Sequence, residues 1–127
     1  MMRISTALLP AMLLVLTGCV WDIPEPVEDI DDFPEVSFSE DVIPILTGNC
    51  LGAGCHGEGA VPPILTVERA HDELMTMEGM VDLDDPQSSV LYARMNDVQR
   101  PMPPSGLLPP RERQLILAWI VQGATDE

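Results

Sequence analysis

The chain has 127 residues and carries 21 acidic against 6 basic residues, which gives a formal net charge of −15 at pH 7. A protein of this charge repels nucleic acid and anionic lipid headgroups, so we expect no nucleic-acid partner. The length suffices for one small domain with flanking segments.

The predicted export signal covers residues 1–18. Arg3 is the one charged residue there, and an apolar run, ALLPAMLLVL, follows over residues 7–16. A helix of that length reaches about 15 Å, half of a bilayer core, so the run is too short to span a membrane. A charged start, a short apolar run and small residues before a cysteine are typical of a secretory signal peptide.

The end of this signal, LTGC, resembles the cleavage site of bacterial lipoproteins. The resemblance implies that Cys19 becomes a lipidated N-terminus that anchors the protein to a membrane. The alternative is an ordinary signal peptide with a leftover cysteine. Val20 stands where an aspartate would favour retention in the inner membrane. We therefore expect an exported lipoprotein in the outer membrane, facing the periplasm.

Residues 19–35 are predicted to be the lipidated cysteine and an acidic, proline-rich tether, and residues 36–127 a folded domain. The segment VWDIPEPVEDIDDFPE has no basic residue, and its self-repulsion favours an extended chain. The alternative is that an apolar residue of this segment, such as Phe33, docks on the domain.

The domain is predicted to be all-α, with four short helices. The first begins near Ser37, which forms a capping box with Glu40, and it runs to about Leu46, with a kink or a late start at Pro44. The second is TVERAHDELMTM, capped by Thr66.

The third helix opens at Asp85, as N-cap, and Pro86 in the segment DDPQSSVLYARM. The fourth starts at Pro109 and Pro110 and stops at Gly123. Its run LILAWIV is apolar nearly all round and is expected to be buried, with Trp119 packed against a cofactor or the first helix.

Residues 49–57, NCLGAGCHG, hold the chemistry-bearing side chains Cys50, Cys55 and His56. A structural zinc site needs four nitrogen or sulfur ligands, and the remaining candidate is His71. A disulfide between the cysteines would close a small loop, as two thiols do in an oxidising compartment. A c-type haem site is normally C-x-x-C-H, so haem requires the two additional residues to loop out, which Gly52 and Gly54 favour.

Several segments in order resemble a small bacterial monohaem cytochrome c domain: FSEDVIPILTGNC, CHG, DPQSSVLYARM, RPMPPSG and LILAWIVQGA. The resemblance implies a cytochrome c-like fold with one haem c bound covalently through Cys50 and Cys55, and His56 as an axial iron ligand. The family has two residues between its cysteines and this chain has four. Whether Cys50 forms the second thioether therefore stays open.

The same resemblance places the second axial ligand, Met102, in the loop RPMPP, where the prolines restrict the backbone. His71 is the rival ligand, although its charged neighbours favour a solvated histidine. Arg94 and Arg100 are candidates for contacts with the haem propionates.

Iron with two protein ligands has no open position for a substrate, so we expect an electron carrier and not an enzyme. His/Met ligation favours a high reduction potential. The partner would be a redox protein with a basic docking patch. Two alternatives remain: a haem-free binding module with a Cys50–Cys55 disulfide, and a peroxidase-like enzyme if Met102 dissociates.

Overall fold

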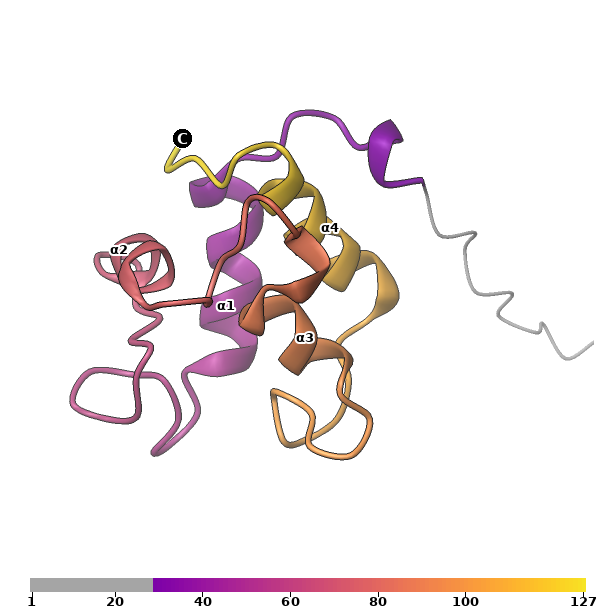
Figure 1. The fold of residues 1–127 in the computed structure, drawn as a ribbon. Helices are drawn as coiled ribbons and strands as arrows, with labels where there is room; N and C mark the ends of the chain where they lie inside the picture. Colours follow the sequence, from indigo (N-terminus) through magenta and orange to yellow (C-terminus); the bar gives the residue numbers. More distant parts are fainter. Residues whose placement is uncertain (1–28) are drawn as a thin grey trace, which may run out of the picture.

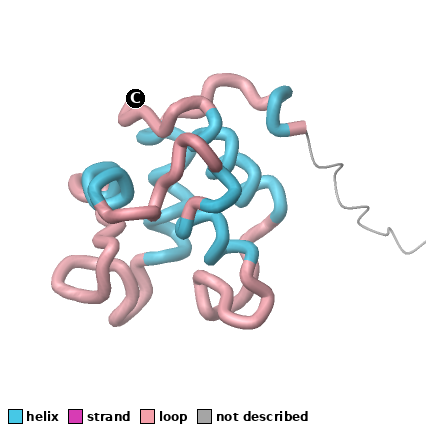
Figure 2. The backbone as a smooth tube through the Cα atoms, in the orientation of Figure 1, coloured by secondary structure: helices cyan, strands magenta, loops and turns pink. Residues whose placement is uncertain are grey.

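The computed structural model describes residues 29–127, and this part of the chain is helical without any β-strand (Figures 1 and 2). The all-α class is therefore confirmed for these residues, and none of their helices is long and apolar enough to cross a bilayer. The predicted signal, residues 1–18, and Cys19 lie outside the described residues. The elements in chain order are η1 (Ile30–Asp32), η2 (Phe38–Val42), α1 (Ile43–Cys50), α2 (Ala70–Thr76), η3 (Pro86–Ser88), α3 (Val90–Asn96) and α4 (Pro110–Val121).

The first helical segment starts where the capping pattern predicts and ends later than expected. The Ser37 hydroxyl accepts a hydrogen bond from the Glu40 amide at 3.1 Å, whereas the return contact comes from Asp41, whose carboxylate accepts from the Ser37 amide at 2.9 Å. The chain makes one wide π-helical turn, η2, before α1 begins. Pro44 lies in the first turn of α1. The amide groups of a first turn have no hydrogen-bond acceptor within the helix, so a proline, which lacks the amide hydrogen, is tolerated there. α1 continues to Cys50, which places the first thiol at its C-terminal end.

The second and third helices start later than the sequence predicts. Thr66 donates its hydroxyl hydrogen to Glu58 at 3.2 Å instead of capping a helix, and α2 begins at Ala70. Asp85 and Pro86 open the single 3-10 turn η3, and α3 begins only at Val90. The Asp85 carboxylate accepts a hydrogen bond from the Ser88 hydroxyl at 2.6 Å.

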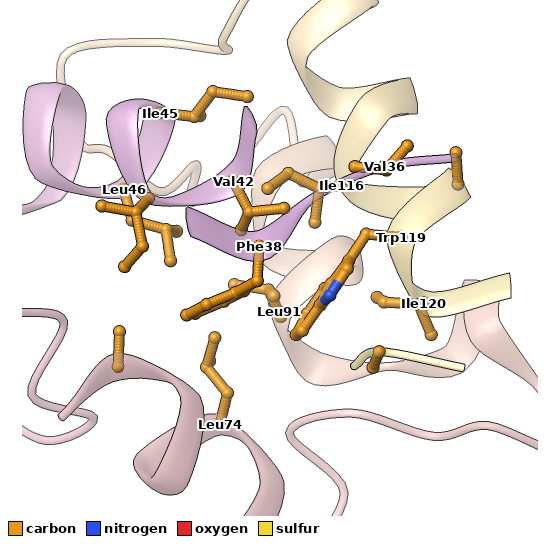
Figure 3. Close-up of a cluster of buried hydrophobic side chains, with 14 of the residues drawn as sticks. Val36, Phe38, Val42, Ile45, Leu46, Leu74, Leu91, Ile116, Trp119 and Ile120 are labelled. Atoms are coloured by element: carbon orange, nitrogen blue, oxygen red, sulfur yellow. The ribbon is translucent and has the colours of Figure 1, made fainter. Parts of the chain in front are cut away.

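The fourth helix matches its prediction closely. α4 begins at Pro110, and Gly123 follows its end with φ of 106°, a backbone angle that favours glycine. The side chains from Ile116 to Ile120 are buried, although Val121 is exposed. Trp119 packs against Phe38 of η2, with 5.0 Å between ring centroids, at the centre of the core (Figure 3).

The segment before residue 36 packs on the domain, as the alternative for Phe33 expects. Phe33 is buried in the core cluster and η1 packs on α4. Gln122, just after α4, clamps this segment with both ends of its side-chain amide. Its nitrogen donates to the Pro34 carbonyl at 3.0 Å, and its oxygen accepts from the Val36 amide at 2.8 Å. Residues 30–35 are therefore part of the domain.

Two long loops project from one end of this helical core. The loop of residues 51–69 joins α1 to α2, and the loop of residues 97–109 joins α3 to α4 (Figure 1). The C-terminus lies at the opposite end. Because the first loop carries Cys55 and His56 and the second carries Met102, the fold brings the predicted site segments to one end of the molecule.

Candidate cofactor-attachment site

The segment between the two cysteines is a closed loop. The His56 amide donates to the Cys50 carbonyl at 3.0 Å, and the Cys55 amide donates to the Gly52 carbonyl at 2.8 Å. Gly54 has φ of 76°, so the glycine at this position provides the left-handed turn. The additional residues are thus folded into a tight turn, and the peptide of His56 begins directly beside the end of α1.

Gly52 contributes in a different way from the one predicted. No positive φ is found there, but a Cβ built on Gly52 would come to 3.4 Å from the Cys55 sulfur. A side chain at this position would therefore lie in van der Waals contact with the thiol.

The two thiols, Cys50 and Cys55, are both free and half-buried. Burial raises the pKa of the Cys50 thiol to about 11, and the negative charge of the Cys55 thiolate adds to the effect. The Cys55 sulfur lies 3.9 Å from the Ala53 carbonyl oxygen. Two reduced thiols flanking one short loop are the groups that add to the vinyl substituents of haem.

The imidazole of His56 is held through one nitrogen. Its Nδ1 lies 2.9 Å from the Val61 carbonyl oxygen and 3.0 Å from the Pro63 carbonyl oxygen. A carbonyl only accepts hydrogen bonds, so Nδ1 must carry the proton, and in the neutral ring the lone pair is then on Nε2. Histidines that ligate metals through one nitrogen usually donate the other N–H to a carbonyl or carboxylate. The tautomer of His56 therefore fits an iron ligand that binds through Nε2.

Met102 lies in the loop of residues 97–109 and its side chain is 41% exposed. Its amide donates to the Arg94 carbonyl at 3.0 Å, which ties the loop to the last turn of α3. The Met102–Pro103 peptide is cis. The Met102 thioether therefore lies on a loop that is tied to α3, and it remains accessible to a metal that takes soft sulfur ligands.

Arg113 of α4 fastens the base of the same loop, a role that the sequence did not reveal. Its Nε donates to the Leu108 carbonyl at 3.0 Å, and its guanidinium also bonds to the side-chain oxygen of Asn96, the last residue of α3. Asn96 in turn donates to the Tyr92 carbonyl at 2.8 Å. The two ends of the loop are thereby joined through a single side chain.

The two candidate propionate contacts, Arg94 and Arg100, share an acidic neighbour. Both lie near the Asp97 carboxylate, at 3.7 Å and 3.9 Å. Hydrogen bonds from the backbone amides of Arg100 and Gln99 lower the pKa of Asp97, and the two guanidinium groups add to this. Both arginines are exposed.

His71 is not the solvated helix histidine that its charged neighbours suggest. Its Nε2 lies 2.9 Å from the Ala124 carbonyl oxygen, and its ring packs edge-on to Phe38 with 5.1 Å between centroids. His71 therefore packs between Phe38 of the core and the C-terminal segment. Among residues 29–127, no three His, Cys, Asp or Glu side chains form a group that could hold a metal ion. Cys50, Cys55 and His56, which lie in this part of the chain, do not form such a group by themselves.

The donor set fits a covalently attached haem. Cys50 and Cys55 supply two reduced thiols, His56 supplies a nitrogen lone pair, and Met102 supplies a thioether at the same end of the fold. Exposed apolar side chains are present on both loops, including Val61, which is 58% exposed, and Val98, which is 77% exposed.

Comparison with known proteins finds no relative of this chain. No family model matches the chain, and neither a curated protein nor a solved structure matches it.

Proposed function

We propose that the protein is an electron carrier, a c-type cytochrome with one covalently bound haem in a cytochrome c-like fold. The observation that carries the proposal is the environment of His56. Its Nδ1–H is engaged by two backbone carbonyls, and its backbone amide is bonded to the residue that bears the first of two free thiols. A merely structural histidine would not require this pair of thiols.

The haem, when bound, supplies an iron that takes up and releases one electron. Cys50 and Cys55 would hold the porphyrin by thioether bonds, each formed when a thiol adds across a vinyl group. His56 would bind iron through Nε2 and is kept in orientation by the Pro63 carbonyl at 3.0 Å. Met102 would supply the second iron ligand, and a soft thioether ligand favours the reduced state and a high potential.

With both His56 and Met102 bound, the iron would have no position left for a substrate, so the proposal is an electron carrier and not an enzyme. The backbone hydrogen bond from Met102 to Arg94 and the side-chain hydrogen bond from Arg113 to the Leu108 carbonyl limit the motion of the loop that would present the thioether. A peroxidase-like reaction would need this loop to withdraw Met102. It would also need an acid–base group, and His71 is engaged by the Ala124 carbonyl.

We further propose that lipid on Cys19 anchors the domain to the outer membrane on its periplasmic side. The acidic tether before residue 30 would give the domain reach between an electron donor and an acceptor. With a formal net charge of −15, the protein would associate fastest with a redox partner that presents a basic patch.

Expression in a bacterial periplasm that matures c-type cytochromes, followed by a haem stain of the denatured protein on a gel, tests the proposal. The host must be one known to accept a four-residue spacing. A stained band at the mass of the mature chain is expected. A colourless protein with a Cys50–Cys55 disulfide would instead support the haem-free binding module.

A further inference from the structure

Glu73, on α2, bonds to the loop that holds His56. Its carboxylate oxygen Oε2 accepts a hydrogen bond from the Ile64 amide at 3.2 Å, while Oε1 lies 2.5 Å from the Arg69 guanidinium. Arg69 also reaches Glu58, at 3.3 Å. A charged group thus contacts the backbone of a loop whose own residues are uncharged around this position.

The amide that Glu73 engages belongs to the same peptide group as the carbonyl that holds His56. In the peptide group between Pro63 and Ile64, the carbonyl oxygen lies 3.0 Å from His56 Nδ1, and the N–H donates a hydrogen bond to the Glu73 carboxylate. Both residues of this peptide are buried, with Ile64 only 5% exposed. Hydrogen bonds in a chain polarise one another, and the effect is larger in a buried, low-dielectric setting.

We propose that Glu73 tunes the iron ligand His56 through the Pro63–Ile64 peptide, as a positioning residue that does not touch the haem. The inference rests on the proposed function, because it assumes that His56 binds iron. Glu73 polarises the peptide, the Pro63 oxygen becomes a stronger acceptor, and the His56 Nδ1–H bond shifts electron density into the ring.

A more electron-rich imidazole stabilises the oxidised iron, so Glu73 lowers the reduction potential of the bound haem. Arg69 opposes this effect, because its positive charge draws electron density from the same carboxylate. Glu73 and Arg69 therefore act in opposite directions on the reduction potential of the haem. Met102, on the opposite loop, acts in the other direction by favouring the reduced state.

The test measures the reduction potential of the full-length haem protein in four variants. Glu73→Gln keeps an oxygen for the Ile64 amide but removes the charge, and it should raise the potential. Arg69→Gln should lower it. Glu58→Gln removes an equal charge from the same cluster without any bond to the peptide, and it should shift the potential far less than Glu73→Gln.

Glu73→Asp separates the bond from the charge, because it keeps the charge and shortens the reach. Its potential should move toward that of Glu73→Gln. If Glu73→Asp matches the wild type, or if Glu58→Gln shifts the potential as much as Glu73→Gln, the effect is one of charge at a distance and the inference is wrong.

A second readout does not require haem. The proton shift and hydrogen exchange of the Ile64 amide, measured by NMR, should change in both Glu73 variants and stay unchanged in Glu58→Gln. A chain that takes up no haem contradicts the proposed function, and the amide then still shows whether Glu73 holds the peptide. Haem that binds with one potential in all four variants contradicts this inference alone.

Discussion

The backbone carbonyl of Cys50 accepts a hydrogen bond from the His56 amide at 3.0 Å, so the first thiol and the iron-ligand candidate stand at the two ends of one closed loop. The four residues between the cysteines therefore form a turn, and the backbones of Cys50 and His56 remain in contact. The predictions that follow test whether this closed loop holds the haem that we propose.

Cys50 is predicted to form the second thioether in spite of the longer loop. Cys50→Ala should retain haem through Cys55 alone, with one thioether where the wild type has two. Peptide mass mapping and the spectrum of the reduced pyridine complex count the saturated vinyl groups. Equal counts in the wild type and Cys50→Ala would show that Cys50 plays no part in attachment.

The thiol of Cys50 is predicted to make the haem-free, reduced protein sensitive to alkaline pH. Its folded pKa of about 11 exceeds the ordinary value of 9.0 for a solvated thiol, so the folded state holds this proton more tightly than the unfolded state. The associated stability is fully present below about pH 9 and is lost as the pH rises through about 11. Denaturant unfolding between these values should show a falling free energy of unfolding, and Cys50→Ala should flatten the fall. An equally steep fall in the variant would assign the effect to another group.

Replacement of Met102 is predicted to change the iron coordination. Met102→Ala should lower the reduction potential and convert the spectrum of the oxidised protein from six-coordinate low-spin toward high-spin, because the thioether is lost. Met75→Ala is the matched control, since Met75 is similarly exposed at 38% but lies on α2. A Met102→Ala protein that keeps the wild-type spectrum and potential would remove Met102 from the ligand set.

Loss of Arg113 is predicted to loosen the Met102 loop. Hydrogen bonds from a charged donor contribute about 1.5–3 kcal/mol, so Arg113→Ala should lower the free energy of unfolding by that order and raise amide exchange over residues 97–109. Arg113→Lys should not restore either, because a lysine cannot reproduce the forked contact with Leu108 and Asn96. Arg100→Ala, at an arginine that is 78% exposed, serves as the control with little effect. Unchanged exchange in Arg113→Ala would mean that the loop is held by its backbone bonds alone.

The contact between Phe38 and Trp119 is predicted to dominate the stability of the domain. Trp119 is 1% exposed and packs on Phe38 at 5.0 Å, so Trp119→Ala should cost about 3–5 kcal/mol of unfolding free energy. Val98→Ala, at a side chain that is 77% exposed, should stay within about 0.5 kcal/mol of the wild type. A loss below about 1 kcal/mol for Trp119→Ala would place the main core elsewhere.

The features that the sequence predicts well depend on neighbours along the chain. The start and end of α4 follow from Pro110 and Gly123, and the turn at Gly54 follows from a glycine in a short loop. In these cases the residue that sets the backbone is part of the element itself.

The features that differ depend on contacts between distant residues. Phe33 docks and Gln122 clamps Pro34, 88 residues away, so an acidic proline-rich run proves to be partly folded. His71 finds the carbonyl of Ala124, 53 residues away, and not solvent. Periodicity and capping patterns contain no information on such pairs, and for the same reason they did not reveal Glu73 or Arg113.

The most direct test of the haem proposal is the intact mass of the mature protein, exported by a host that accepts this spacing. We expect the mass of the chain from Cys19 onward, with its lipid and one covalently bound haem, and with no free thiol at Cys50 or Cys55. A mass without haem and lower by two hydrogens, as a Cys50–Cys55 disulfide would give, contradicts the account.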